Sequence, residues 1–336
     1  MTKMKDEMIE EQVQEKGETP FYGMITSIND AEKKLVQWNP DDKDLEDFPN
    51  YVINCLCEDP NIYGTADAYH NLASEFARKR LYKQAELVST FGTMKYPFNV
   101  DLLADVVKFG SNTQDWDSCD DAYRELRSID YSKWTWRTFT FVIDYLLVKL
   151  ELPDTDSKAV NRDLKELIAQ YKKLNDERAW VAESELLEKM GKQKEMIAVL
   201  KNGIATVNVA PQCCLKLTDV LLENGEYDDV IKFAAIGLRG TAQEQPSASI
   251  GYFTYVSALA KDALIHKEDF ENSQQAQPGE NKGFQNLAAV HDALLDYAIA
   301  KRLLQGRHIY LATIAQRELV LRFKSGIGLG KDDDSK

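Results

Sequence analysis

A repeated spacing of about 34 residues constrains the fold of this chain more than any other feature of its sequence. Gly191 and Gly225 show this spacing. The same shift superimposes a whole set of apolar and small residues: Trp180, Leu187, Gly191, Met196 and Gly203 fall on Cys214, Leu221, Gly225, Val230 and Gly237. Such a period indicates a small supersecondary unit that recurs along the chain and buries its apolar face by stacking on its neighbours.

A further unit is visible earlier in the chain, at residues 66–99. Its apolar and small residues recur at helical spacing, and a proline follows near its end: Tyr69, Leu72, Ala73, Phe76, Tyr82, Ala85 and Pro97. The same shift applied to Tyr82 and Ala85 gives Trp116 and Cys119, again an aromatic and a small residue. Small residues let two helices approach closely and proline ends a helix, so each unit is predicted to be a pair of helices.

This pattern resembles the tetratricopeptide repeat, a helix-turn-helix unit of about 34 residues. The family has Gly at repeat position 15, where this chain has Arg80, Gln114, Gly191 and Gly225 in units 66–99, 100–133, 177–210 and 211–244. The resemblance covers residues 65–245; unit 100–133 is degenerate and unit 134–176 is longer than the family's repeat. It implies an all-α fold, a right-handed superhelical solenoid of antiparallel helix pairs.

The rest of the chain is expected to be helical, with a polar tail at each end. The sequence predicts an acidic N-terminal tail with short helices over residues 1–64, followed by the repeats over 65–245. It predicts C-terminal helix pairs over 246–325, with a flexible loop at 271–283, and a disordered tail over 326–336. Apolar periodicity and helix-stop residues predict helices at 29–38, 45–58, 138–150, 157–174, 250–266, 284–304 and 308–324.

The net charge of −14 argues against nucleic acid and against an anionic membrane surface as partners. Residues 1–60 contain six Lys and fifteen Asp or Glu, a balance of −9, so the remaining residues are closer to neutral and leave room for a local basic groove. No segment approaches the roughly 20 apolar residues of a membrane span, and the charged start is unlike a signal peptide. A cytoplasmic location is expected.

No cluster of residues has the spacing of a metal or catalytic site. The cysteine pairs Cys55/Cys57 and Cys213/Cys214 lack the spacing and the further ligands of a zinc site, so the cysteines are expected to be reduced core residues. The four histidines form no close pair, although residues distant in sequence could still meet in the fold. The chain is therefore interpreted as a protein without cofactor or metal, and not as an enzyme.

In the resembling family, positions 2, 5, 9, 12 and 13 of the first helix of each pair line a concave groove. Carried over, these are Asp67, His70, Ser74, Ala77 and Arg78; Asp101, Ala104, Lys108, Ser111 and Asn112; Thr138, Val142 and Tyr145; Arg178, Val181, Glu185, Glu188 and Lys189; and Gln212, Leu215, Asp219, Leu222 and Glu223. Positions 5 and 9 lack the Lys and Asn with which some members clamp a chaperone tail, so that partner is disfavoured.

The aromatic segment 131–145 has two readings. Trp136 and Tyr145, with Arg137, could form a hot spot for a partner, or the aromatic side chains could pack within and between repeats. The selected partner-binding residues are His70, Ser74, Arg78, Lys108, Asn112, Arg178, Glu185, Lys189, Trp136 and Tyr145. The predicted function is an interaction scaffold or adaptor that binds a protein or peptide. The alternatives are a peptide-sensing regulator and a non-catalytic subunit of an enzyme complex.

Overall fold

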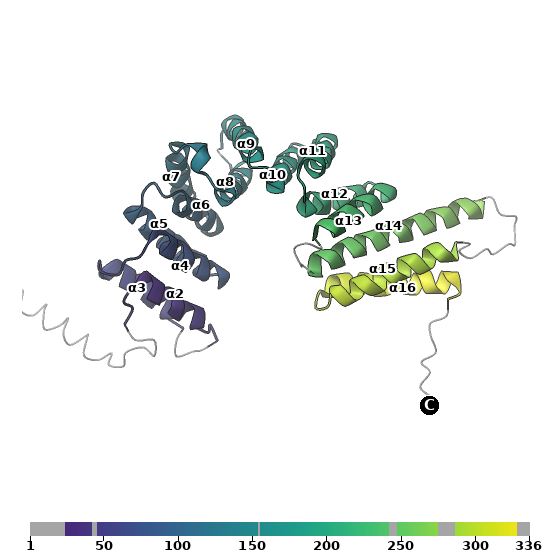
Figure 1. The fold of residues 1–336 in the computed structure, drawn as a ribbon, viewed down its shortest axis with the longest axis horizontal. Coiled ribbons are helices and arrows are strands. Elements are labelled where there is room, and N and C mark those ends of the chain that lie inside the picture. Colours follow the sequence, from purple (N-terminus) through teal and green to yellow (C-terminus); the bar gives the residue numbers. More distant parts are fainter. Residues whose placement is uncertain (1–23, 42–45, 154, 242–246, 275–285, 328–336) are drawn as a thin grey trace, which may run out of the picture. The chain divides into compact units, whose positions relative to one another are not determined.

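The computed structural model describes residues 24–41, 46–153, 155–241, 247–274 and 286–327. These residues form fifteen α-helices and contain no strand (Figure 1). The chain divides into two compact units, residues 1–160 and 161–336, and the division falls inside α9 (Ser157–Lys172). No helix among the described residues is both long and apolar enough to cross a membrane.

Unit 1 is built from helix hairpins that pack side by side. Its elements are α2 (Ile28–Gln37), α3 (Phe48–Glu58), α4 (Ala66–Arg78), α5 (Tyr82–Lys95), α6 (Val100–Thr113), α7 (Trp116–Arg127), a 3-10 turn (Tyr131–Lys133) and α8 (Trp136–Lys149). Helices α4 and α5 form one hairpin and α6 and α7 the next; α8 packs on α6, α2 packs on α4, and α3 packs on α5. This arrangement brings the first helices α4, α6 and α8 next to one another.

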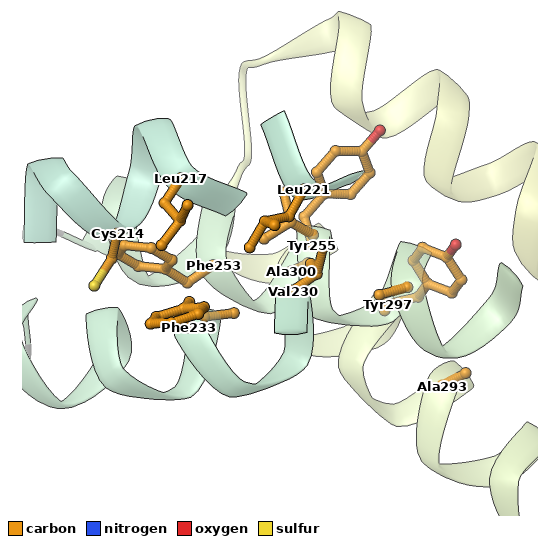
Figure 2. Packing of buried hydrophobic residues seen from close by; sticks show 14 of the residues in the cluster. Cys214, Leu217, Leu221, Val230, Phe233, Phe253, Tyr255, Ala293, Tyr297 and Ala300 are labelled. Carbon is orange, nitrogen blue, oxygen red and sulfur yellow. The ribbon is translucent and has the colours of Figure 1, made fainter. Parts of the chain in front are cut away.

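Unit 2 continues with the same kind of hairpin. After α9 come α10 (Glu177–Lys189), α11 (Gln193–Thr206), α12 (Pro211–Glu223), α13 (Tyr227–Thr241), α14 (Ser247–Gln274), α15 (Leu287–Leu303) and α16 (His308–Ser325). The pairs α10–α11, α12–α13 and α14–α15 pack together, and α16 lies against α15 and α14. One continuous apolar cluster runs from α11 to α16 and includes Leu217, Leu221, Phe233 and Phe253 (Figure 2).

The backbone repeats with the spacing found in the sequence. Gly191 and Gly225 have φ of 70° and 74°, and Arg80 and Gln114, at the corresponding turns of unit 1, both have φ of 63°. Each of these residues follows the first helix of a hairpin. A left-handed conformation is unfavourable for Arg and Gln, so the packing of the two helices sets the turn geometry at these positions rather than the residue type.

Small residues allow the helices of unit 2 to approach closely, as their spacing in the sequence indicated. Gly237 of α13 lies so near Phe253 of α14 that a Cβ atom at this position would overlap with the ring. Gly203, at the equivalent position of α11, faces Trp180 of α10. In unit 1, Ala85 is completely buried in α5. These contacts fix the spacing between neighbouring helices.

The observed helices correct two predicted bounds. Helix α14 extends from Ser247 to Gln274 instead of ending at residue 266, because residues 267–274 contain no Pro or Gly that would end the helix. Residues 271–274 of the predicted loop are therefore helical, and 275–283 lie outside the described residues. Most of the two predicted tails also lies outside the described residues. Helix α16 ends at Gly326, which has a φ of 69°.

Candidate functional site

Three side chains meet where the first helices of unit 1 pack against each other. His70 of α4 donates a hydrogen bond from Nδ1 to the carboxylate of Asp105 in α6, and Arg137 of α8 donates from Nη1 to Nε2 of the same imidazole at 2.7 Å. Because Arg has only donors, Nε2 must be the acceptor, which fixes His70 as the Nδ1–H tautomer. Asp105 and Arg137 are 35 and 67 positions from His70 in sequence, yet the three residues form one chain of hydrogen bonds.

Burial determines the electrostatics of this triplet. The side chain of Asp105 is 1% exposed and that of His70 is 16% exposed. Burial raises the pKa of Asp105, while the hydrogen bond from His70 and the charge of Arg137 act in the opposite direction. Sequence reasoning selected His70 but missed Asp105. The sequence did contain a signal for Asp105, because it is the one acid inside the apolar run Leu102–Val107. An acid in such a run is expected to be buried, and a buried carboxylate needs a hydrogen-bonding or charged partner.

Next to this triplet, two cations lie close to one aromatic ring. The Nζ atom of Lys108 lies 5.3 Å from the centre of the half-buried Phe141 ring, and the guanidinium of Arg137 lies 5.7 Å from it. Lys108 also lies 3.5 Å from the carboxylate of Asp144. We call the surface of His70, Ser74, Arg78, Lys108, Asn112, Arg137, Phe141 and Asp144 the α4–α6–α8 face.

The remaining selected residues of α4 and α6 are partly or fully exposed. The side chain of Arg78 is 67% exposed and lies 2.5 Å from the carboxylate of Glu75 in the preceding turn. Asn112 is exposed, and its amide donates a 2.7 Å hydrogen bond to the carbonyl of Lys108. Ser74 is half-buried. Arg78 and Asn112 thus present polar groups to solvent at one end of their helices.

The structure changes the register expected for α8. Helix α4 is capped by Thr65 and α6 by Asn99, one repeat later, but α8 is capped by Thr135, whereas the same spacing would place its cap at Lys133. The residues carried over with the regular period, Thr138, Val142 and Tyr145, are all buried. The prediction of Tyr145 as a partner-binding residue is therefore wrong for this conformation. Arg137, Phe141 and Asp144 occupy the α4–α6–α8 face instead.

The aromatic residues of 131–145 divide between core and surface. Tyr145 is completely buried and donates its hydroxyl proton to Asp120. Burial and the neighbouring carboxylate raise its pKa. Trp134 and Phe139 are also buried, with ring centres 5.1 Å apart. Trp136 is 43% exposed, so it is the aromatic residue selected from this segment that a partner can reach directly.

The selected residues of unit 2 lie on α10 and interact with nearby residues. Arg178 makes two hydrogen bonds to Asp176, at 2.8 and 2.7 Å. Lys216 of α12, which sequence reasoning missed, lies 3.6 Å from Glu185 and 2.8 Å from Glu188. Lys189 is exposed at the end of α10. These residues form a separate polar surface within unit 2.

The described residues contain no group of three side chains that could hold a metal ion. Cys119, Cys213 and Cys214 are buried, and burial raises the pKa values of their thiols, to about 12 for Cys119 and Cys214. These three are poor nucleophiles and metal ligands at neutral pH. The expectation that all cysteines are core residues is wrong for Cys57, which is exposed at the end of α3.

No protein-family model matches the chain, and no curated protein matches it either. A functional assignment therefore depends on the helix hairpins and on the side chains of the α4–α6–α8 face.

Proposed function

We propose that this protein is a helical-repeat scaffold of the tetratricopeptide type that binds a protein or peptide partner on the α4–α6–α8 face. The recurring hairpins, and the left-handed turns that recur at the repeat spacing, support the repeat assignment. The right-handed superhelical solenoid, with first helices lining a concave groove, is part of this proposal.

The observation that carries the binding proposal is the placement of both Lys108 and Arg137 close to the Phe141 ring, at 5.3 and 5.7 Å from its centre. An aromatic ring beside cations offers apolar contact area together with charged donors at one place. Aromatic residues and Arg are the types most enriched among residues that dominate binding energies. Trp136 is exposed and adjacent in sequence to Arg137, so it adds a second aromatic ring that a partner can contact near this cation.

An acid-base enzyme is less well supported by the same residues. His70 and Asp105 have the composition of a catalytic dyad, but the imidazole nitrogen that would take a proton, Nε2, already accepts a hydrogen bond from Arg137. The hydrogen bonds of His70 and Asp105 are therefore better suited to holding Arg137 in position on the surface than to transferring a proton.

The test begins with affinity isolation of partners on the full chain, followed by calorimetry with the purified partner. The double variant Lys108→Gln and Arg78→Gln removes two charges and keeps most of the side-chain length. We expect affinity to fall at least about tenfold, which is about 1.4 kcal/mol, with an unchanged melting temperature. Lys95→Gln, exposed on the second helix α5, serves as the control and should bind normally. Equal affinity of the double variant and the parent would contradict the proposed binding face.

A further inference from the structure

The last helix of the chain, α16, has apolar residues on two opposite sides. Ile314 and Leu321 are completely buried and pack into the core of unit 2. On the other side, Ile309 is 76% exposed, Leu319 is 50% exposed and Phe323 is 82% exposed. A surface helix of a monomer is expected to have one apolar stripe and one polar face, so the exposed side of α16 departs from that pattern.

The exposed residues follow the spacing of a coiled-coil seam. Successive steps of three and four residues connect Ile309, Ala312, Gln316, Leu319 and Phe323, and all five are exposed. With Ile309, Gln316 and Phe323 at the a positions and Ala312 and Leu319 at d, the buried Ile314 and Leu321 occupy f, the position opposite the seam. We call these five residues the α16 seam. A seam with this period is suited to packing against another helix along about 20 Å.

We propose that the α16 seam pairs with the α16 seam of a second copy of this chain, in parallel, to form a dimer. This inference does not depend on the proposed partner-binding function. The central residue of the seam favours a copy over an unrelated helix. The side-chain amide of Gln316 has an NH2 group that donates and a carbonyl oxygen that accepts. In a parallel pair it meets the partner's Gln316, so each amide can donate a hydrogen bond to the other and accept one from it. A single polar residue at an a position is a known means of setting the register of a coiled coil.

The residues that flank the seam are compatible with the parallel pairing. Position g of one helix faces position e of the other. In a parallel pair this places His308 beside the partner's Thr313 and Ala315 beside the partner's Val320. No two like charges are brought together at these positions, and Ala315 and Val320 widen the apolar contact.

An antiparallel pairing is less favourable. In an antiparallel coiled coil the a positions of one helix pack against the d positions of the other, so Gln316 would face Ala312 or Leu319 of the second copy. Its amide would then be buried against an apolar side chain without a matching amide. The position of Gln316 in the seam therefore favours the parallel direction.

The first test is sedimentation of the full chain over concentrations from roughly 1 µM to 1 mM, the range in which a small interface associates. We expect the mass to rise towards twice that of the chain. Leu319→Glu and Phe323→Glu should each raise the dissociation constant at least about tenfold while the melting temperature stays unchanged, since both side chains are substantially exposed. Leu295→Glu is the matched control: Leu295 is 58% exposed on α15, outside the seam, and this variant should dimerise normally.

The direction of pairing is tested by cross-linking. In a Cys57→Ser background, which removes the exposed native thiol, Ala312→Cys should form a disulfide between two copies, because the two residues 312 meet in a parallel seam. A chain that stays monomeric over the whole range, or a dimer unaffected by Leu319→Glu, would overturn the proposal. Dimerisation that appears only after removal of residues 1–23 would also overturn it, since that segment of the chain would then cover the seam. A dimer without the Ala312→Cys cross-link would rule out the parallel pairing.

Discussion

Arg137 donates a hydrogen bond to His70 across 67 residues of sequence, and the contact joins α8 to α4 over the buried carboxylate of Asp105 in α6. The same guanidinium lies beside the Phe141 ring. Asp105 thus holds the imidazole of His70 in one orientation, and the imidazole in turn holds the guanidinium of Arg137 on the α4–α6–α8 face. The stability of unit 1 and the position of its surface charges are therefore coupled through three residues.

The first prediction concerns Asp105. Asp105→Ala should lower the free energy of unfolding by about 1–3 kcal/mol, because it leaves a largely buried N–H of His70 without its acceptor. Asp105→Asn keeps an acceptor oxygen and should cost less. Urea denaturation measures both values. Glu125→Ala, exposed on α7, is the control and should change stability by no more than about 0.5 kcal/mol. If Asp105→Ala matched that control, the triplet would contribute nothing to folding.

The second prediction concerns the repeat turn at Arg80. Its φ of 63° is unfavourable for any residue with a Cβ atom, and Gly occupies the same repeat position at Gly191 and Gly225. Arg80→Gly should raise the free energy of unfolding by up to about 1 kcal/mol, as relief of this strain outweighs the flexibility that Gly adds to the unfolded chain. Lys194→Gly, exposed within α11, should instead lower it by up to about 1 kcal/mol. A loss of stability in Arg80→Gly would show that the turn is not strained.

The period and the hairpins could be predicted from the sequence because small residues and glycines recur at fixed spacing, as Gly203 and Gly237 do. The register of α8 could not be predicted, since the shift of its cap from Lys133 to Thr135 changes no apolar pattern that the repeat period would reveal. Tyr145 was misplaced for this reason. His70 was selected, but its hydrogen bonds to Asp105 and Arg137 were not predicted, because the sequence does not show which residues of distant helices meet; the one local signal was the acid inside the apolar run Leu102–Val107.

The third prediction concerns close packing at Gly237. Gly237→Ala should destabilise the protein by about 1–3 kcal/mol, because the new methyl group would overlap with the ring of Phe253. Phe253→Leu removes the ring and should reduce the additional cost of Gly237→Ala in a double-mutant cycle. Thermal or urea unfolding of the four proteins gives the coupling energy. Additive effects of the two substitutions would contradict the direct contact.

The last prediction concerns pH and rests on His266 of α14. Burial lowers the pKa of His266; Arg317 and Lys324 of α16 lower it as well, while Asp262 and Asp269 of its own helix act in the opposite direction. Asp262 also lies 3.6 Å from the imidazole and accepts a hydrogen bond from Tyr297 of α15 at 3.0 Å. The unfolded chain, in which the pKa of His is about 6.5, therefore binds a proton more readily than the folded protein does.

Stability should consequently be lost as the pH falls below about 6.5, because protonation of His266 then favours the unfolded chain. Urea denaturation at about pH 7.5 and about pH 5.5 measures this loss on either side of the ordinary pKa of His. His266→Gln cannot take up the proton and should lose less stability on acidification than the parent protein. His291→Gln is the matched control, because His291 is exposed on α15; it should keep the loss seen in the parent. Equal losses in His266→Gln and in the parent would mean that acidification acts through other groups, and that the α14–α16 packing tolerates a charged imidazole.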